Sequence, residues 1–225
     1  MASVGSLREH LVEELNDLLN AEEQLVDALP KMAERATSRE LRAAFRGHLA
    51  ETRQHAKRVT QALKQLGEKA SGKTCEAMKG LLAEGQELMD GSDAGALRDA
   101  MMITAAQKVE HYEIATYGTV RTYARVIGER GVAKLLQLTL KEEHAADRKL
   151  TKIAEGSVNR RASEEWHEQT SVLQKGAQWV GSTVGGALKR VMPHIEAADR
   201  RSAPSRKSSK AKGTRGRKRA RSSSR

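Results

Sequence analysis

Four segments of the sequence carry carboxylate or imidazole side chains at positions where a helix would otherwise present an apolar face. In the first segment, positions 11, 15, 18, 22, 25 and 29 are all leucine except Glu22. Residues three or four apart lie on one face of a helix, so this glutamate interrupts an apolar stripe. The acidic and imidazole residues on the four stripes, or on the turn beside them, are Glu22, His48, Glu51, His55, Glu110, Glu143 and Asp147.

These residue types indicate a metal site. Burial of one unpaired carboxylate is costly, and burial of four close together requires compensation by cations. Carboxylates and imidazoles suit iron and manganese, and helical bundles that project glutamates inward from facing helices hold such ions in pairs. Any one of these residues alone would more often lie on a helix surface. The sequence predicts a pair of Fe or Mn ions because four separate stripes carry a glutamate: Glu22, Glu51, Glu110 and Glu143.

Other polar residues beside the stripes would orient the ligands. His48, Glu113, His111 and His144 are the candidates for hydrogen bonds to ligands, although His111 and His144 fit a solvated surface position equally well. Tyr117, on the third stripe, could donate an electron or a hydrogen bond to a redox metal site, or simply pack in the core.

The spacing of apolar residues predicts that helices position these side chains. Only three prolines occur and aromatic residues make up 3%, which favours an all-α fold. Long helices are predicted from after Ser6 to about Ala36, from a cap at Thr37 or Ser38 to Gly67, over 94–127 and over 130–155. Pro30 should kink the first helix rather than end it. A short helix within 75–89 could carry the chain along the bundle, which predicts a four-helix bundle with a crossover segment between the second and third helices.

The net charge of +11 belongs to one end of the chain. Residues 200–225 hold twelve lysines or arginines and no acidic residue, whereas the remaining 28 basic residues face 29 acidic ones. This stretch has no apolar residue larger than alanine or proline, so we predict a disordered basic tail. Without aromatic residues it could contact DNA only through phosphates and without sequence preference, and a merely solvated tail is the alternative. The predicted contacts are Arg206, Lys207, Lys210, Lys212, Arg215, Arg217, Lys218, Arg219 and Arg221.

The chain is predicted to have three parts: the bundle over 1–160, a weakly helical extension over 161–199 and the basic tail over 200–225.

Cys75 is the only cysteine, which rules out an intramolecular disulfide and fits a reducing compartment. The N-terminal segment lacks the apolar core of a signal peptide, and no apolar run approaches the roughly 20 residues that span a bilayer. We expect a cytoplasmic protein without membrane association, placed at the nucleoid if the tail binds DNA.

Five segments of the sequence resemble the YciE/YciF ferritin-like family of bacterial stress-associated proteins, in order over about residues 6–160. They are AEEQL (21–25), FRGHLAETRQH (45–55), CEAMKGLLAEG (75–85), AAQKVEHYEIATYGT (105–119) and TLKEEHAADRKL (139–150). The resemblance implies a ferritin-like bundle, a homodimer and a ferroxidase-type activity. It also implies a ligand set of Glu22, Glu51, Glu110 and Glu143, with His55 and Asp147 as companions. Ferritin-like ligand pairs are usually Glu-x-x-His, whereas Glu51 and His55 are four residues apart, so the coordination geometry departs from that pattern.

Three functions follow from these patterns. The leading hypothesis is a dinuclear-metal protein that oxidises Fe(II) with oxygen or peroxide, with Glu51 and Glu143 as the best candidates to bridge the metals. A manganese catalase-like dismutation of peroxide is the enzymatic alternative. A non-enzymatic, DNA-associated stress protein is the alternative from another class, and it is compatible with the first because the tail and the bundle are separate.

Overall fold

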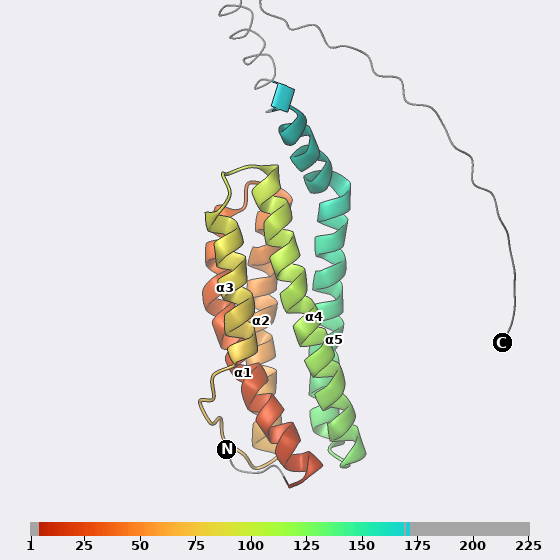
Figure 1. The fold of residues 1–225 in the computed structure, drawn as a ribbon. Helices are drawn as coiled ribbons and strands as arrows, with labels where there is room; N and C mark the ends of the chain where they lie inside the picture. The colour runs from red at the N-terminus through yellow and green to blue at the C-terminus, as the bar shows by residue number, and fades with distance from the viewer. Residues whose placement is uncertain (1–4, 169, 172–225) are drawn as a thin grey trace, which may run out of the picture. The chain divides into compact units, whose positions relative to one another are not determined.

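The computed structural model describes residues 5–168, 170 and 171, and the regular structure in this part of the chain is entirely helical. The elements are α1 (Leu7–Arg35), α2 (Arg39–Gln65), α3 (Glu76–Asp90), α4 (Ala96–Val126), α5 (Arg130–Ile153) and a π-helical turn η1 (Ala154–Val158). The four long helices lie side by side as a bundle, and the shorter α3 lies along the outside (Figure 1). This arrangement confirms the predicted all-α four-helix bundle.

The bundle order explains the need for α3. Helix α1 packs against α2, α2 against α5, α5 against α4, and α4 against α1. The short loops at 36–38 and 127–129 join antiparallel neighbours, whereas the chain must travel the length of the bundle between α2 and α4. Helix α3 provides that crossover and packs against α4 and α1 (Figure 1).

Local sequence sets the helix ends. The hydroxyls of Ser6 and Ser38 accept hydrogen bonds from the backbone N–H groups three residues ahead, so each caps a helix. Gly67 and Gly128 adopt positive φ angles of 74° and 89° directly after α2 and α4, where a residue with a side chain would be strained. Helix α1 continues through Pro30.

A buried carboxylate fastens the start of α2 to α4. Asp99, which is 2% exposed, accepts hydrogen bonds from the backbone N–H groups of Thr37 at 2.8 Å and Ser38 at 2.6 Å. These two N–H groups precede α2 and have no partner within it. The same side chain therefore satisfies the helix terminus and fixes its position against a neighbour.

The core consists of two apolar clusters with buried polar side chains between them. One cluster includes Leu25, Phe45 and Met102, and the other includes Leu15 and Leu136. Apart from Asp99, the buried acidic or imidazole residues of the four long helices lie where the stretches that supply the two clusters meet. Leucine dominates the second cluster, whereas alanine and methionine are frequent in the first.

The helical path extends beyond the predicted end at 155. After η1 the chain is again α-helical over 159–168, which includes the first residues of the predicted extension over 161–199. The carboxylate of Glu165 accepts hydrogen bonds from the N–H groups of Ala96 and Leu97 and so caps α4. Apart from residues 170 and 171, the rest of that extension and the predicted tail over 200–225 lie outside the described residues. Within the described part, no helix is both long and apolar enough to cross a membrane.

Candidate metal centre

Each long helix places at least one buried side chain that could bind a metal in the polar layer between the two apolar clusters. Six side chains gather there, and each is less than a tenth exposed: Glu22 from α1, His48 and His55 from α2, Glu110 and Glu113 from α4, and Glu143 from α5. Four helices that meet in one layer explain how residues up to 121 positions apart come together. Their chemistry, carboxylate and imidazole, is that of Fe and Mn sites.

The six side chains form two donor sets that share one residue. In the first set, Glu22, His55 and Glu143 each offer an atom within 4.8 Å of the others. In the second set, His48, Glu110, Glu113 and Glu143 do the same. Glu143 is the shared member, and it offers one oxygen to each neighbouring histidine: Oε1 lies 2.8 Å from His55 Nδ1 and Oε2 lies 3.9 Å from His48 Nε2.

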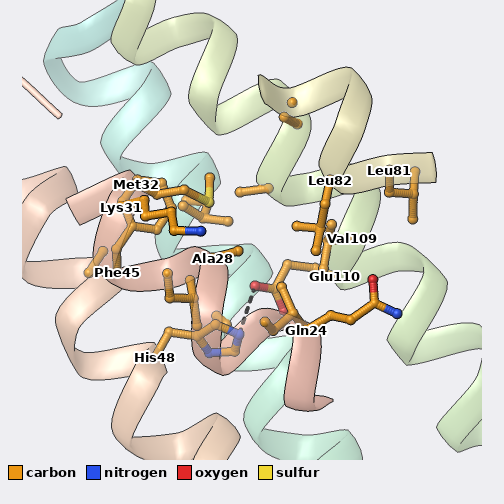
Figure 2. Close-up of a pocket in the computed structure, with 18 of the residues that line it drawn as sticks. Gln24, Ala28, Lys31, Met32, Phe45, His48, Leu81, Leu82, Val109 and Glu110 are labelled. Atoms are coloured by element: carbon orange, nitrogen blue, oxygen red, sulfur yellow. Dashed lines mark ion pairs between the residues drawn. The ribbon is translucent and has the colours of Figure 1, made fainter. Parts of the chain in front are cut away.

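The remaining short distances define each set more closely. His55 Nδ1 lies 3.6 Å from Glu22 Oε1 in the first set. His48 Nε2 lies 3.3 Å from Glu110 Oε1 in the second, the pair that Figure 2 marks with a dashed line. These distances place two histidine nitrogens on opposite sides of Glu143, each facing carboxylate oxygens. Two ions with one carboxylate between them fit this arrangement.

Seven buried atoms in these sets have no hydrogen-bond partner among the described residues, although some are close enough for ion pairs. They are Glu22 Oε2, His55 Nδ1, Glu110 Oε2, both oxygens of Glu113 and both oxygens of Glu143. More than nine tenths of buried polar groups in native proteins have a partner, so a cluster of this kind requires an explanation. Bound cations would satisfy these acceptors, and the donor set therefore fits a metal pair.

Burial and mutual repulsion favour the protonated carboxyl groups in the metal-free protein. Burial, together with the nearby charge of Glu143, raises the pKa of Glu110 to about 8. Burial raises the pKa of Glu113 well above its usual value, with further increases from Glu22 and Glu143. Burial likewise raises the pKa of Glu22, against the lowering effect of His55. Cations that replace these protons would relieve the same repulsion.

The two histidines respond in the opposite sense to their surroundings. Burial lowers the pKa of His48, but the neighbouring Glu51, Glu110 and Glu143 more than offset this effect and raise it to about 9. Burial also lowers the pKa of His55, and contacts with Glu143 and Glu22 raise it to about 11. Both imidazoles are thus cationic in the metal-free protein and must lose a proton before they can bind a metal.

Glu142 and Arg58 support His55 from the outer side of the bundle. His55 Nε2 lies 2.8 Å from Glu142 Oε2, and the Arg58 guanidinium donates to both oxygens of Glu142. Burial raises the pKa of Glu142, but the bonds with Arg58 and His55 outweigh it and lower the pKa below its usual value. A carboxylate that holds the outer nitrogen of a histidine leaves the inner nitrogen available to a metal.

Sequence reasoning missed these two residues because Glu142 has the features of a surface glutamate and Arg58 lies 84 positions away. It did single out Tyr117, whose buried hydroxyl donates a hydrogen bond to Glu22 Oε1 at 2.5 Å. Tyr117 is fully buried. Tyr117 therefore both packs in the core and donates a hydrogen bond to Glu22, a predicted metal ligand.

Four residues predicted from the sequence lie outside both donor sets. The side chain of Glu51 is 50% exposed and lies 3.4 Å from His48 Nδ1, on the outer side of that ring. Asp147 accepts a hydrogen bond from Gln107 at 3.0 Å, while His111 is exposed and lies 3.4 Å from Asp147. His144 is exposed. By contrast His48 and Glu113, predicted as ligand neighbours, supply atoms of the second set.

Residues 6–163 match the protein family described as a domain of unknown function, DUF892. The chain belongs to this family. It is 44% identical over 149 residues to protein YciF of Escherichia coli strain K12, and the match covers 66% of this chain and 90% of YciF. These matches confirm the family resemblance predicted from the sequence motifs.

Solved structures give the same result for this DUF892 chain. The crystal structure of the E. coli stress protein YciF aligns with a TM-score of 0.67 at 41% identity, and covers 69% of this chain and 99% of that chain. The structure of YcfI from Rhodopseudomonas palustris aligns with a TM-score of 0.64 at 39% identity, and covers 67% of this chain and 96% of that chain. The family match ends at residue 163, so the residues after it lie outside the matched region.

Proposed function

We propose that this chain is a dinuclear-metal protein that oxidises Fe(II) with oxygen or peroxide as part of stress protection. The observation that supports the proposal best is Glu143, which is fully buried, is shared by both donor sets and has one oxygen nearest each of the two histidines. Membership of the same family as the E. coli stress protein YciF is in line with this role.

The residues divide into two ligand groups around Glu143. Glu22 and His55 would hold one ion, whereas His48, Glu110 and Glu113 would hold the other. Two bound ions can together supply the two electrons that one oxidant molecule takes up. With two protons these electrons convert oxygen to peroxide, or peroxide to two water molecules.

The surrounding side chains hold protons and orient ligands. The hydroxyl of Tyr117 donates to Glu22 and so fixes which of its oxygens is free. Glu142 holds the outer nitrogen of His55. The two apolar clusters lie above and below the layer, and its carboxylates are buried, which strengthens electrostatic interactions within it.

Metal analysis and Fe(II) oxidation on one set of variants test this proposal. Reconstituted wild-type protein should bind about two ions per chain and oxidise Fe(II) rapidly. Glu143→Gln keeps the shape but removes the charge, so it should lower the stoichiometry to one or less and abolish rapid oxidation. Glu23→Gln, an exposed neighbour on α1, is the matched control. Less than about half an equivalent of metal in well-folded wild-type protein would contradict the proposal.

The manganese catalase-like alternative differs in its metal and in its oxidant. Protein reconstituted with Mn would then release oxygen from peroxide, and would consume no oxygen with Fe(II). Oxygen-electrode recordings on Fe-loaded and Mn-loaded samples distinguish these outcomes. Light scattering on the same samples tests the homodimer that the family resemblance implies.

We also propose that the C-terminal segment associates with DNA through phosphates. The supporting observation is its composition, twelve lysines or arginines and no acidic residue in 200–225. Full-length protein should retard DNA of any sequence at low salt, and the retardation should weaken steeply as salt is added. Deletion of 200–225 should remove this binding and leave helical content unchanged. Equal retardation by the truncated protein would assign the binding to another part of the chain.

A further inference from the structure

A cavity of about 380 Å³ borders the candidate metal centre. Its walls are mostly apolar, with Ala28 and Met32 from α1, Leu82 from α3 and Val109 from α4 around it (Figure 2). His48 and Glu110 also line it, and point toward one another at one side. This mostly apolar cavity therefore lies directly beside the second donor set.

Small side chains keep this volume open. The walls include Gly85 and six alanines at 28, 44, 105, 106, 145 and 146, whereas the other end of the bundle core is filled by leucines such as Leu15 and Leu136. A Cβ added at Gly85 would lie 3.3 Å from that of Ala105, so α3 approaches α4 closely there. Protein interiors are otherwise closely packed, and an open volume lowers stability in proportion to its size.

One residue of the lining carries a buried polar atom without a partner in the described part of the chain. Glu110, a residue of the lining, is 3% exposed, and its Oε2 has no hydrogen-bond partner among the described residues. The exposed polar residues of the lining are Asp27, Lys31, Glu51, Gln86 and Lys149, from α1, α2, α3 and α5. The cavity thus has a buried polar boundary at Glu110 and exposed polar residues at the surface.

The volume is larger than oxygen or peroxide requires. Oxygen or peroxide needs only a narrow opening, whereas 380 Å³ lies in the range of about 300–1,000 Å³ that is typical of sites for small organic ligands. Such sites combine apolar walls with a few polar groups that fix orientation. A ligand with an apolar chain and one polar end matches this distribution.

We propose that the cavity binds an aliphatic monocarboxylate of medium chain length, with its carboxylate beside His48 and Glu110 and its chain along Leu82 and Val109. The apolar walls bind the chain. The position of the carboxylate rests on the proposed function, because cations in the donor sets would attract an anion at this boundary more strongly than the imidazole of His48 does alone. The centre would then act on, or be regulated by, a fatty-acid-like molecule as well as an oxidant.

Calorimetric titration with octanoate and with 1-octanol tests the proposal on full-length protein, either loaded with Mn(II) or stripped by a chelator. Octanoate should bind once per chain and at least ~10-fold more tightly to the loaded protein, whereas the neutral alcohol should bind both forms equally. Ala28→Phe and Leu82→Trp fill the cavity from two helices. Each should weaken both probes by at least ~10-fold and raise the melting temperature of the stripped protein.

Ala56→Phe is the matched control, since Ala56 is a half-buried helical alanine in contact with the other apolar cluster. It should bind both probes as the wild type does. The proposal would be overturned if the wild type bound neither probe, or if the two filled variants bound the probes as tightly as the wild type does. Equal octanoate affinity in stripped and loaded wild-type protein would also overturn it. If the wild type takes up no metal, only the proposed function is contradicted. Binding of 1-octanol to the wild type and its loss in Ala28→Phe would still support the ligand site.

Discussion

Replacement of Glu113 by leucine should stabilise the metal-free protein and weaken its metal site. Glu113 is fully buried, and both its carboxyl oxygens lack a hydrogen-bond partner among the described residues. A buried polar group without a partner costs about 1–3 kcal/mol. Removal of two such oxygens relieves this cost twice, and the imperfect fit of the branched leucine side chain offsets part of the gain. We therefore expect the free energy of unfolding to rise by about 2–4 kcal/mol.

This gain is large enough to measure by thermal denaturation. One kcal/mol shifts the melting temperature of a domain of this size by roughly 2–4 °C, so the chelator-treated Glu113→Leu protein should melt roughly 5–15 °C above the wild type. Addition of Mn(II) should raise the melting temperature of the wild type more than that of the variant, because a ligand that binds only the folded state stabilises it.

Glu23→Leu provides the control, since Glu23 is exposed on α1 and should change the melting temperature by little with or without metal. A lower melting temperature for metal-free Glu113→Leu would show that Glu113 belongs to a structural network with partners of its own. Equal stabilisation of wild type and variant by Mn(II) would show that Glu113 does not bind metal.

Three further predictions follow from the same contacts. The pKa of Glu110 is raised to about 8 and that of His48 to about 9, so the folded metal-free protein holds protons that the unfolded chain has released. Its melting temperature should therefore fall from about pH 5 to pH 9. With Mn(II) bound the melting temperature should instead rise with pH, and the same trend in both samples would contradict this. Glu142→Gln should weaken metal binding by roughly 10–100-fold in a chelator competition, with exposed Lys141→Gln as control, and unchanged affinity would exclude a role in holding His55. Asp99→Ala should lower the unfolding free energy by about 1–3 kcal/mol in urea denaturation, without change in metal content, because two backbone N–H groups lose their acceptor.

The fold could be predicted because each helix carries its own boundary signals. Ser38 and Gly67 flank α2 in the roles expected of a cap and a terminator, and the leucine stripe of α1 marks its buried face. The gathering of Glu22, Glu110 and Glu143 could also be predicted, since each replaces an apolar residue on such a stripe and each is buried.

The rest of the site depended on which helix lies against which. Helix α4 packs against α1, α5 and also α3, so its buried face is broad enough to include both Glu110 and Glu113. Helix α2 packs only against α1 and α5 among the long helices, so its buried face is narrower. Thr52 is buried there, while Glu51 turns toward solvent. A period of 3.6 residues does not reveal the width of a buried face.

The polar layer between the two apolar clusters has a consequence for how the helices align. A helix that slid by one turn along its neighbours, about 5.4 Å, would move a carboxylate such as Glu143 from this layer into contact with leucines. Burial of that group among apolar side chains would be strongly unfavourable. A bundle held together by leucine alone has several slipped arrangements of similar energy, and a single buried polar position is known to select one of them. The acidic layer therefore makes the correct register of all four helices the favourable one, even before any ion is bound.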